Sequence, residues 1–285
     1  MPITAPNREA LARRIEQLER TSGRRNAMMT TVPLQCPAID SVLPDGGLRT
    51  GAVHEVLGPV ISDGGTTDRG VGQSQDQRGD GAVMGFACVV LARLMQAPGA
   101  DAGPVVWCMN RRLRYRHGLL SGQVYAPGLH SFGIAMQRLL FVYGSNDEET
   151  LWATEEAVRS AAVGVVVAEL FDLHSLAARR LQLAAEASAT TVLALRPGHA
   201  GAAGGFVETR WRAASLTDGS NATAAATAAA LGHWRIELLR ARRRLAGGRW
   251  SVRWQDRQLE AVLEVASDVS IDRDKQDDAV RFGRR

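Results

Sequence analysis

The stretch from Val53 to Leu91 constrains the fold of this chain more than any other. It opens with a short apolar run, Val53–Leu57, which turns at Gly58-Pro59. A polar, glycine-rich segment, residues 61–80, leads into an apolar run that begins at Gly81 and predicts a buried helix. A strand, a glycine-led loop and a helix in this order are the layout of a phosphate-binding loop. We therefore expect an α/β fold built on this unit.

The loop lacks the residue that would hold a phosphate. A phosphate-binding loop places a lysine and then Ser or Thr after its second glycine, because the lysine ammonium contacts the phosphates. Counted from Gly58, this position is taken by residues 63–65 (Asp-Gly-Gly), and a shift of one residue gives Gly-Gly-Thr. The chain contains one lysine, Lys275, near its C-terminus. We interpret the loop as degenerate and expect no nucleotide cofactor and no enzyme activity. Its recognisable residues are Gly58, Gly64, Gly65 and Thr66.

Charge and cysteine usage narrow the cellular setting. The net charge of +4 suits an anionic partner without requiring one. The cysteines Cys36, Cys88 and Cys108 are scattered in apolar surroundings, which argues against a disulfide framework or a metal site and indicates a reducing compartment. The N-terminus has no apolar leader, and no window is long and apolar enough to span a membrane. We expect a soluble, cytoplasmic protein.

Apolar runs alternate with helical patterns through the middle of the chain. The predicted strands cover residues 105–109, 139–143, 163–167 and 191–195, and the predicted helices cover 148–161, with Asp147 as the cap, and 174–188. Strands that alternate with helices of this length predict βαβ units and a mostly parallel sheet with helices on its faces.

The same patterns divide the chain into three parts. Residues 1–31 form an amphipathic helix and a tether, residues 32–257 form the core, and residues 258–285 form a charged, disordered tail. Within the core we expect a disordered insertion at 61–80, a connector at 214–231 and a hairpin at 233–257. The first helix presents Leu11, Ile15 and Leu18 on one face, which packs either on its own domain or on a partner.

The C-terminal hairpin is rich in arginine and tryptophan. Eight arginines lie between Arg235 and Arg257, interleaved with Trp234, Trp250 and Trp254. Arginine neutralises phosphates, and both residue types stack on bases. The alternative is a solvated edge hairpin whose tryptophans pack on the core. A second basic cluster follows the strand at 105–109. The candidate DNA or protein contacts are Arg240, Arg242, Arg243, Arg244, Arg249, Trp250 and Arg253, with Arg111, Arg112 and Arg114 from the second cluster.

No other pattern supports catalysis. Glu169 ends a buried strand where a nucleotidase would place a Walker B carboxylate, but without a phosphate partner a helix-capping or interface role is favoured. Asp172, His174 and Ser175 are neighbours in sequence, whereas a catalytic triad converges from separate elements. The six histidines do not reach metal-ligand spacing. We expect no catalytic residue and no metal.

Several segments, in order, resemble a known family. They are Val32-Pro33-Leu34, Gly46-Gly47-Leu48, residues 51–56, 125–129, 149–159, 165–169 and 179–187. Over residues 32–197 the chain resembles the RecA-type fold and, specifically, the ImuA family of RecA-like mutagenesis proteins, which is grouped with SulA-like sequences. The resemblance implies a RecA-like P-loop NTPase fold with a mostly parallel central sheet.

The family also implies a function. Its members are damage-inducible and act in translesion synthesis beside ImuB, a non-catalytic relative of Y-family polymerases, and an error-prone DnaE-type polymerase; some are implicated in regulating RecA. For this chain, the resemblance together with the missing lysine implies a non-catalytic adaptor in SOS-induced translesion synthesis. The charge of the hairpin at 233–257 predicts weak, non-specific DNA binding as a secondary contact. Two alternatives are a RecA-like ATPase with an atypical nucleotide loop and a SulA-like inhibitor of cell division.

Overall fold

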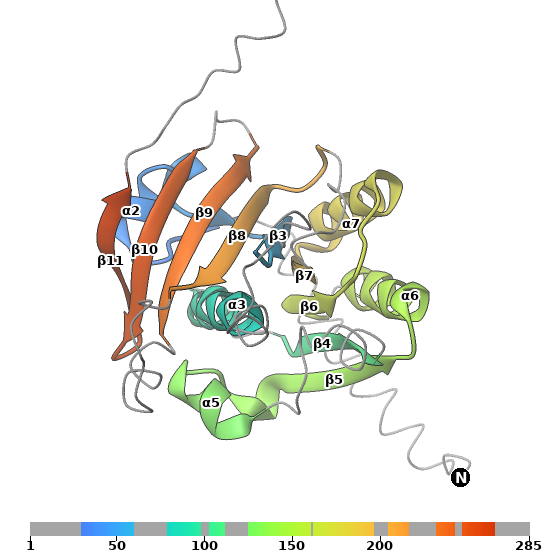
Figure 1. Ribbon diagram of the computed structural model, residues 1–285. Coiled ribbons are helices and arrows are strands. Elements are labelled where there is room, and N and C mark those ends of the chain that lie inside the picture. Colours follow the sequence, from blue (N-terminus) through green and yellow to red (C-terminus); the bar gives the residue numbers. More distant parts are fainter. Residues whose placement is uncertain are drawn as a thin grey trace, which may run out of the picture.

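The protein is built on one large twisted sheet (Figure 1). The computed structural model describes residues 30–59, 79–97, 103–111, 125–160, 162–196, 205–216, 232–242 and 247–265. Nine strands pair in the order β11-β10-β9-β8-β3-β7-β6-β4-β5. The predicted N-terminal helix with Leu11, Ile15 and Leu18 lies outside the described residues, as does most of the predicted insertion.

Six of the strands form the parallel part of the sheet. They are β3 (Val53–Leu57), β4 (Val105–Asn110), β5 (Leu139–Gly144), β6 (Val165–Glu169), β7 (Thr191–Arg196) and β8 (Thr209–Ser215). Every residue of β3, β4, β6 and β7 is buried. Continuous apolar runs are typical of strands with helices on both faces. The prediction of an α/β fold with a mostly parallel sheet is confirmed, and the architecture is consistent with a RecA-like fold.

The remaining strands extend the sheet in antiparallel pairing from β8. They are β9 (His233–Ala241), β10 (Gly248–Gln255) and β11 (Gln258–Val265). The tail predicted from residue 258 is therefore corrected, because its first residues form a strand. β10 pairs with β9 on one side and with β11 on the other, so β11 is the edge at this end. The predicted connector also starts later, since β8 continues to Ser215.

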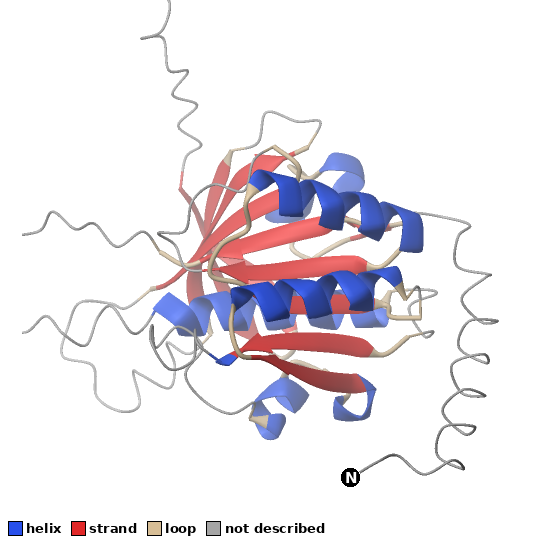
Figure 2. Ribbon diagram, turned by 90° about the vertical axis from the view of Figure 1, so that its right-hand side faces the viewer, coloured by secondary structure: helices blue, strands red, loops and turns tan. Residues whose placement is uncertain are grey.

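Helices cover both faces of the sheet (Figure 2). α6 (Asp147–Arg159) and α7 (Ser175–Ser188) lie side by side on one face, and α3 (Gly79–Gln96) lies on the other. The α3 side is the larger core, and it includes Trp107, Trp211 and Trp234. A Cβ atom on Gly85 of α3 would collide with the ring of Trp234, so this glycine allows the helix to approach β9.

The N-terminal described segment packs in the same core as α3. It consists of β1 (Thr31–Val32), α2 (Pro37–Asp40), η2 (Pro44–Gly46) and β2 (Leu48–Arg49). Two short helices, α5 (Ala126–Ser131) and η5 (Met136–Arg138), precede β5. Within the described residues, no helix combines the length and the apolar character needed to cross a membrane.

The start of α6 differs from the prediction. Asp147 was expected to cap this helix, but the cap is Asn146, whose side-chain oxygen accepts a hydrogen bond from the Glu149 amide at 2.9 Å. Asn and Asp are equally good caps, so residue type could not distinguish them. Asp147 is used in a tertiary contact instead.

Candidate functional site

The carboxyl ends of the parallel strands converge at one edge of the sheet, where open α/β sheets bind their ligands. Glu55, Asn110, Glu169 and Arg196 lie in or at the ends of β3, β4, β6 and β7, and all four are buried. Gly58 follows β3 and donates its amide to the Arg196 carbonyl at 3.0 Å. The predicted loop residues Gly64, Gly65 and Thr66 lie outside the described residues.

A buried ion-pair network lies beside the end of β3. Glu55 binds Arg196 through one carboxylate oxygen and Arg210 through the other. Arg196 also donates from Nη2 to Asp172 Oδ1 at 2.7 Å. The side chains of Glu55 and Arg196 are fully buried, and that of Arg210 is 14% exposed. Because both oxygens of Glu55 already have a cationic partner, this carboxylate is a structural anchor for three strands.

Glu169, the Walker-B-like residue, is fixed to the neighbouring strand. It is fully buried and accepts hydrogen bonds from Trp107 Nε1 at 3.0 Å and from the Asn110 amide at 3.3 Å. Trp107 and Asn110 both belong to β4, and Asn110 is its last residue. The carboxylate therefore joins β6 to β4.

Asp147 completes this edge. Its side chain accepts from Asn110 Nδ2 at 2.7 Å, from the Phe171 amide at 2.8 Å and from the Asp172 amide at 2.9 Å. The contacts tie the start of α6 to the segment after β6. Aspartate accepts several hydrogen bonds at once, which explains why it occupies this position rather than the cap.

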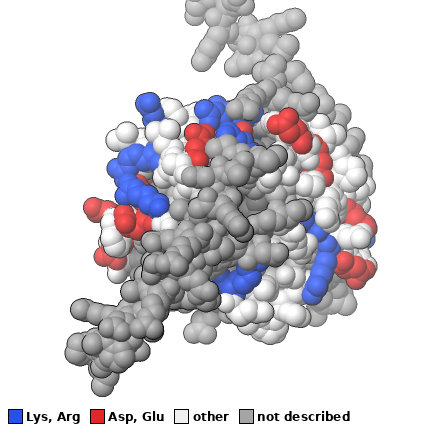
Figure 3. Space-filling model, turned by 180° about the vertical axis from the view of Figure 1, so that it is seen from behind, with Lys and Arg blue, Asp and Glu red and all other residues white. Residues whose placement is uncertain are grey.

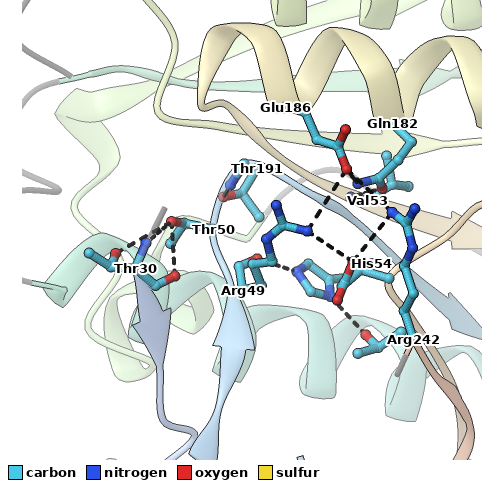
Figure 4. Close-up of polar contacts among 12 residues, drawn as sticks. Thr30, Arg49, Thr50, Val53, His54, Gln182, Glu186, Thr191 and Arg242 are labelled. Carbon is cyan, nitrogen blue, oxygen red and sulfur yellow. Dashed lines mark hydrogen bonds and ion pairs between the residues drawn. The ribbon is translucent and has the colours of Figure 1, made fainter. Parts of the chain in front are cut away.

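A second polar cluster lies at the opposite, amino end of β3 (Figure 4). Arg49 lies 3.5 Å from Glu208 and 3.8 Å from Glu186. Arg242 lies 3.3 Å from Glu186 and 3.9 Å from Glu208. The two arginines and two glutamates alternate and join β2, α7 and the segments before β8 and after β9. Arg242, predicted as a DNA or protein contact, is thus held in an ion-pair cluster.

His54 lies next to this cluster in a directed hydrogen-bond chain. Trp211 Nε1 donates to the Thr209 hydroxyl at 2.8 Å, which lies 2.7 Å from His54 Nδ1; His54 Nε2 lies 2.8 Å from the Arg49 carbonyl. A carbonyl only accepts, so Nε2 carries the proton and Nδ1 accepts from the hydroxyl. Burial lowers the pKa of His54 to about 4, although the hydrogen bond to the Arg49 carbonyl raises it. The ring is therefore neutral. We find no signal in the sequence for this chain of contacts.

The tryptophans of the C-terminal strands face the core. Trp234 and Trp250 are buried with α3, and the half-buried Trp254 stacks on Phe132 with ring centroids 5.3 Å apart. The interpretation of Trp250 as a contact residue is corrected, because strand alternation turns it inward. The alternative packing interpretation holds for these rings.

The predicted arginines that the structure describes make different contacts. Arg249 lies 3.1 Å from Glu237, and Arg240 donates to the Gly205 carbonyl at 3.0 Å. Arg253 is exposed, and the guanidinium of Arg111 lies over the Tyr143 ring at 5.4 Å. Arg112, Arg114, Arg243 and Arg244 lie outside the described residues. On the face seen in Figure 3, basic groups lie beside acidic groups.

The described residues contain no group of three or more His, Cys, Asp or Glu placed to hold a metal. Cys36, Cys88 and Cys108 are buried free thiols, and burial raises the pKa of Cys88 to about 12.

Comparison with known proteins identifies the family. Protein ImuA of Caulobacter vibrioides strain NA1000 / CB15N is 31% identical over 230 residues, which cover 77% of this chain and 82% of the relative. Protein ImuA of strain ATCC 19089 / CIP 103742 / CB 15 matches to the same extent. The chain belongs to the ImuA family. No protein-family model matches it. The family predicted from the sequence is therefore confirmed, and the site described above is that of an ImuA-family protein.

Proposed function

We propose that this protein is a non-catalytic, RecA-like adaptor in damage-induced translesion DNA synthesis. Its partners would be an ImuB-like protein and an error-prone DnaE-type polymerase, with RecA as a further partner. Membership of the ImuA family supports the mutagenesis pathway. The observation that carries the proposal of an adaptor is the sheet edge at the end of β3, which is the place where a RecA-like protein would bind a nucleotide.

The chemistry of that edge supports a role without ATP turnover. Glu55, Glu169 and Asp147 are each bound to protein donors that link strands or helices. Lys275, the one lysine in the sequence, is far along the chain from the loop after β3. Because the carboxylates stabilise the fold, this edge resembles a scaffold more than a catalytic centre.

Nucleotide binding distinguishes the adaptor from a RecA-like ATPase. We expect the melting temperature of the full chain to be unchanged by millimolar ATP and Mg²⁺. A ligand at a hundred times its Kd stabilises by about 2.7 kcal/mol, which shifts the melting temperature visibly. A RecA protein measured in parallel is the positive control. A reproducible ATP-dependent rise would support the ATPase and contradict the adaptor without nucleotide.

Partner capture tests the adaptor role directly. We expect the tagged full chain, recovered from cells treated with a DNA-damaging agent, to bring down an ImuB-like protein or the error-prone polymerase. Replacement of Leu11, Ile15 and Leu18 by aspartate should abolish capture if the first helix is the partner surface. Glu16→Ala/Arg20→Ala, on the charged flanks of the same predicted helix, is the matched control.

The outcomes of this capture separate the remaining functions. Recovery of RecA together with the polymerase would extend the adaptor role to RecA. Recovery of cell-division proteins alone, with filamentous growth on overexpression, would contradict it in favour of the SulA-like inhibitor.

A further inference from the structure

The outer face of β8, β9 and β10 is an arginine-rich surface. The inward residues of these strands, such as Trp211, Trp234 and Val252, pack in the α3 core. Strand alternation places their neighbours on the opposite face. α6 and α7 pack on that face mainly over the strands from β3 to β7. We define the outward residues Arg212, Arg235, Arg249 and Arg253 as the arginine face.

The register brings these arginines into adjacent rows. Arg212 on β8 and Arg249 on β10 both lie opposite Glu237 on β9, at 3.3 Å and 3.1 Å from its carboxylate. Arg235 lies in the next row, opposite Ser251, and Arg253 lies one row further. Rows of alternate residues are about 7 Å apart along a strand. Glu260 on β11 lies opposite Arg253, so four guanidinium groups and two carboxylates share this face, which leaves an excess of positive charge.

The strands of this face differ in how their side-chain nitrogens are partnered. Among the described residues, Arg212 Nε, Arg240 Nε and His233 Nε2 are buried and have no hydrogen-bond partner. His233 lies opposite Arg253, so it belongs to the arginine face. Arg235 and Arg253 are exposed and form no ion pair with any described residue. The guanidinium groups of Arg235 and Arg253 are therefore cations on this face that a ligand can reach.

The character of the surface favours one class of ligand. The described parts of β8, β9 and β10 expose no large apolar side chain. A protein partner usually needs apolar or aromatic anchors at the centre of its interface. A phosphate backbone needs only cationic and N–H donors. The aromatic rings that would stack on bases face the core instead, so recognition on this face is limited to the backbone.

We propose that the arginine face binds the phosphate backbone of a nucleic acid without reading its sequence. The site is additional to the adaptor role, and its test needs neither ATP nor a protein partner. Duplex and single strands both bind, because both carry the phosphate backbone that the arginines contact. The binding is steeply dependent on salt.

Fluorescence anisotropy of the full chain with a labelled duplex, and with one of its strands, tests the site over a salt series. The variant Arg235→Gln/Arg253→Gln removes two exposed guanidinium groups that have no ion-pair partner among the described residues. Each lost phosphate contact changes the log–log salt slope by about 0.9 on duplex and about 0.7 on single strands. We expect the double variant to bind more weakly and to lose about 1.8 slope units on duplex.

Two further variants make the result specific. Arg235→Lys/Arg253→Lys retains both charges and should keep the salt slope. Arg159→Gln removes an arginine of α6 whose side chain is 57% exposed and should change neither affinity nor slope. Wild-type melting temperatures for all variants would exclude unfolding as the cause.

Three results would overturn the proposal. The first is that the full chain binds neither oligonucleotide at low salt. The second is that the double variant keeps the wild-type affinity and salt slope. The third is loss of a captured protein partner by the double variant while oligonucleotide binding is unchanged, since the occupant is then an acidic protein.

Discussion

Replacing Glu55 by leucine is expected to lower the free energy of unfolding by about 3–5 kcal/mol. The carboxylate is fully buried and binds both Arg196 and Arg210. Its removal leaves the guanidinium of Arg196 buried with Asp172 as its remaining described carboxylate partner. Removing one partner from a buried ion-pair network is far more destabilising than losing a surface pair. Urea denaturation of the wild type and the variant measures the difference.

The matched control is Glu156→Leu. This glutamate also pairs with an arginine, Arg159, at 2.9 Å, but its side chain is 50% exposed. Exposed pairs contribute about 0–1 kcal/mol, so the control should be nearly neutral. The variant Glu55→Leu/Arg196→Leu should recover part of the loss, because an apolar pair of similar volume replaces a buried ion pair well. A change below about 1 kcal/mol for Glu55→Leu would show that the network does not stabilise the fold.

Acidification is expected to destabilise the protein through His54. The ordinary pKa of histidine is 6.5, and burial lowers that of His54 to about 4. Because the folded-state pKa is the lower one, the unfolded chain binds a proton first as the pH falls. The contribution of His54 is therefore complete above pH 6.5 and is lost progressively down to about pH 4. The loss amounts to about 3 kcal/mol.

Urea denaturation between neutral pH and the lower end of this window tests the prediction. His54→Gln is the matched comparison, because glutamine has a donor and an acceptor for the contacts to Arg49 and Thr209 but does not titrate in this range. We expect the stability of this variant to depend less on pH than that of the wild type. Equal pH dependence of the two proteins would show that His54 is not the titrating group.

The elements of the parallel sheet could be predicted because their signal is local. The runs at β4, β6 and β7 are apolar at nearly every residue, which is typical of strands buried on both faces. β11 was missed because it lies at the start of a charged tail and carries Glu260 and Glu264 among its apolar residues. Its pairing with β10, which its own residues do not reveal, makes it a strand.

The polar sites could not be predicted, because their partners are distant in sequence. Glu55 meets Arg196 and Arg210 across 141 and 155 residues. The direction of each tryptophan in the C-terminal strands likewise depends on which face of the sheet meets α3. Residue type identified Trp250 and Arg242 as candidates, but packing placed one in the core and the other in an ion-pair cluster.

The sequence by itself determined the alternation of strands and helices, the absence of a lysine in the loop after β3, and the resemblance to the ImuA family. These properties follow from local periodicity and from residue identity. Only the tertiary structure decided which charges are neutralised, which donors lack acceptors and which face of β8–β10 is exposed. Those outcomes depend on strand register and burial, because these decide which carboxylate, carbonyl or ring lies within reach of each arginine.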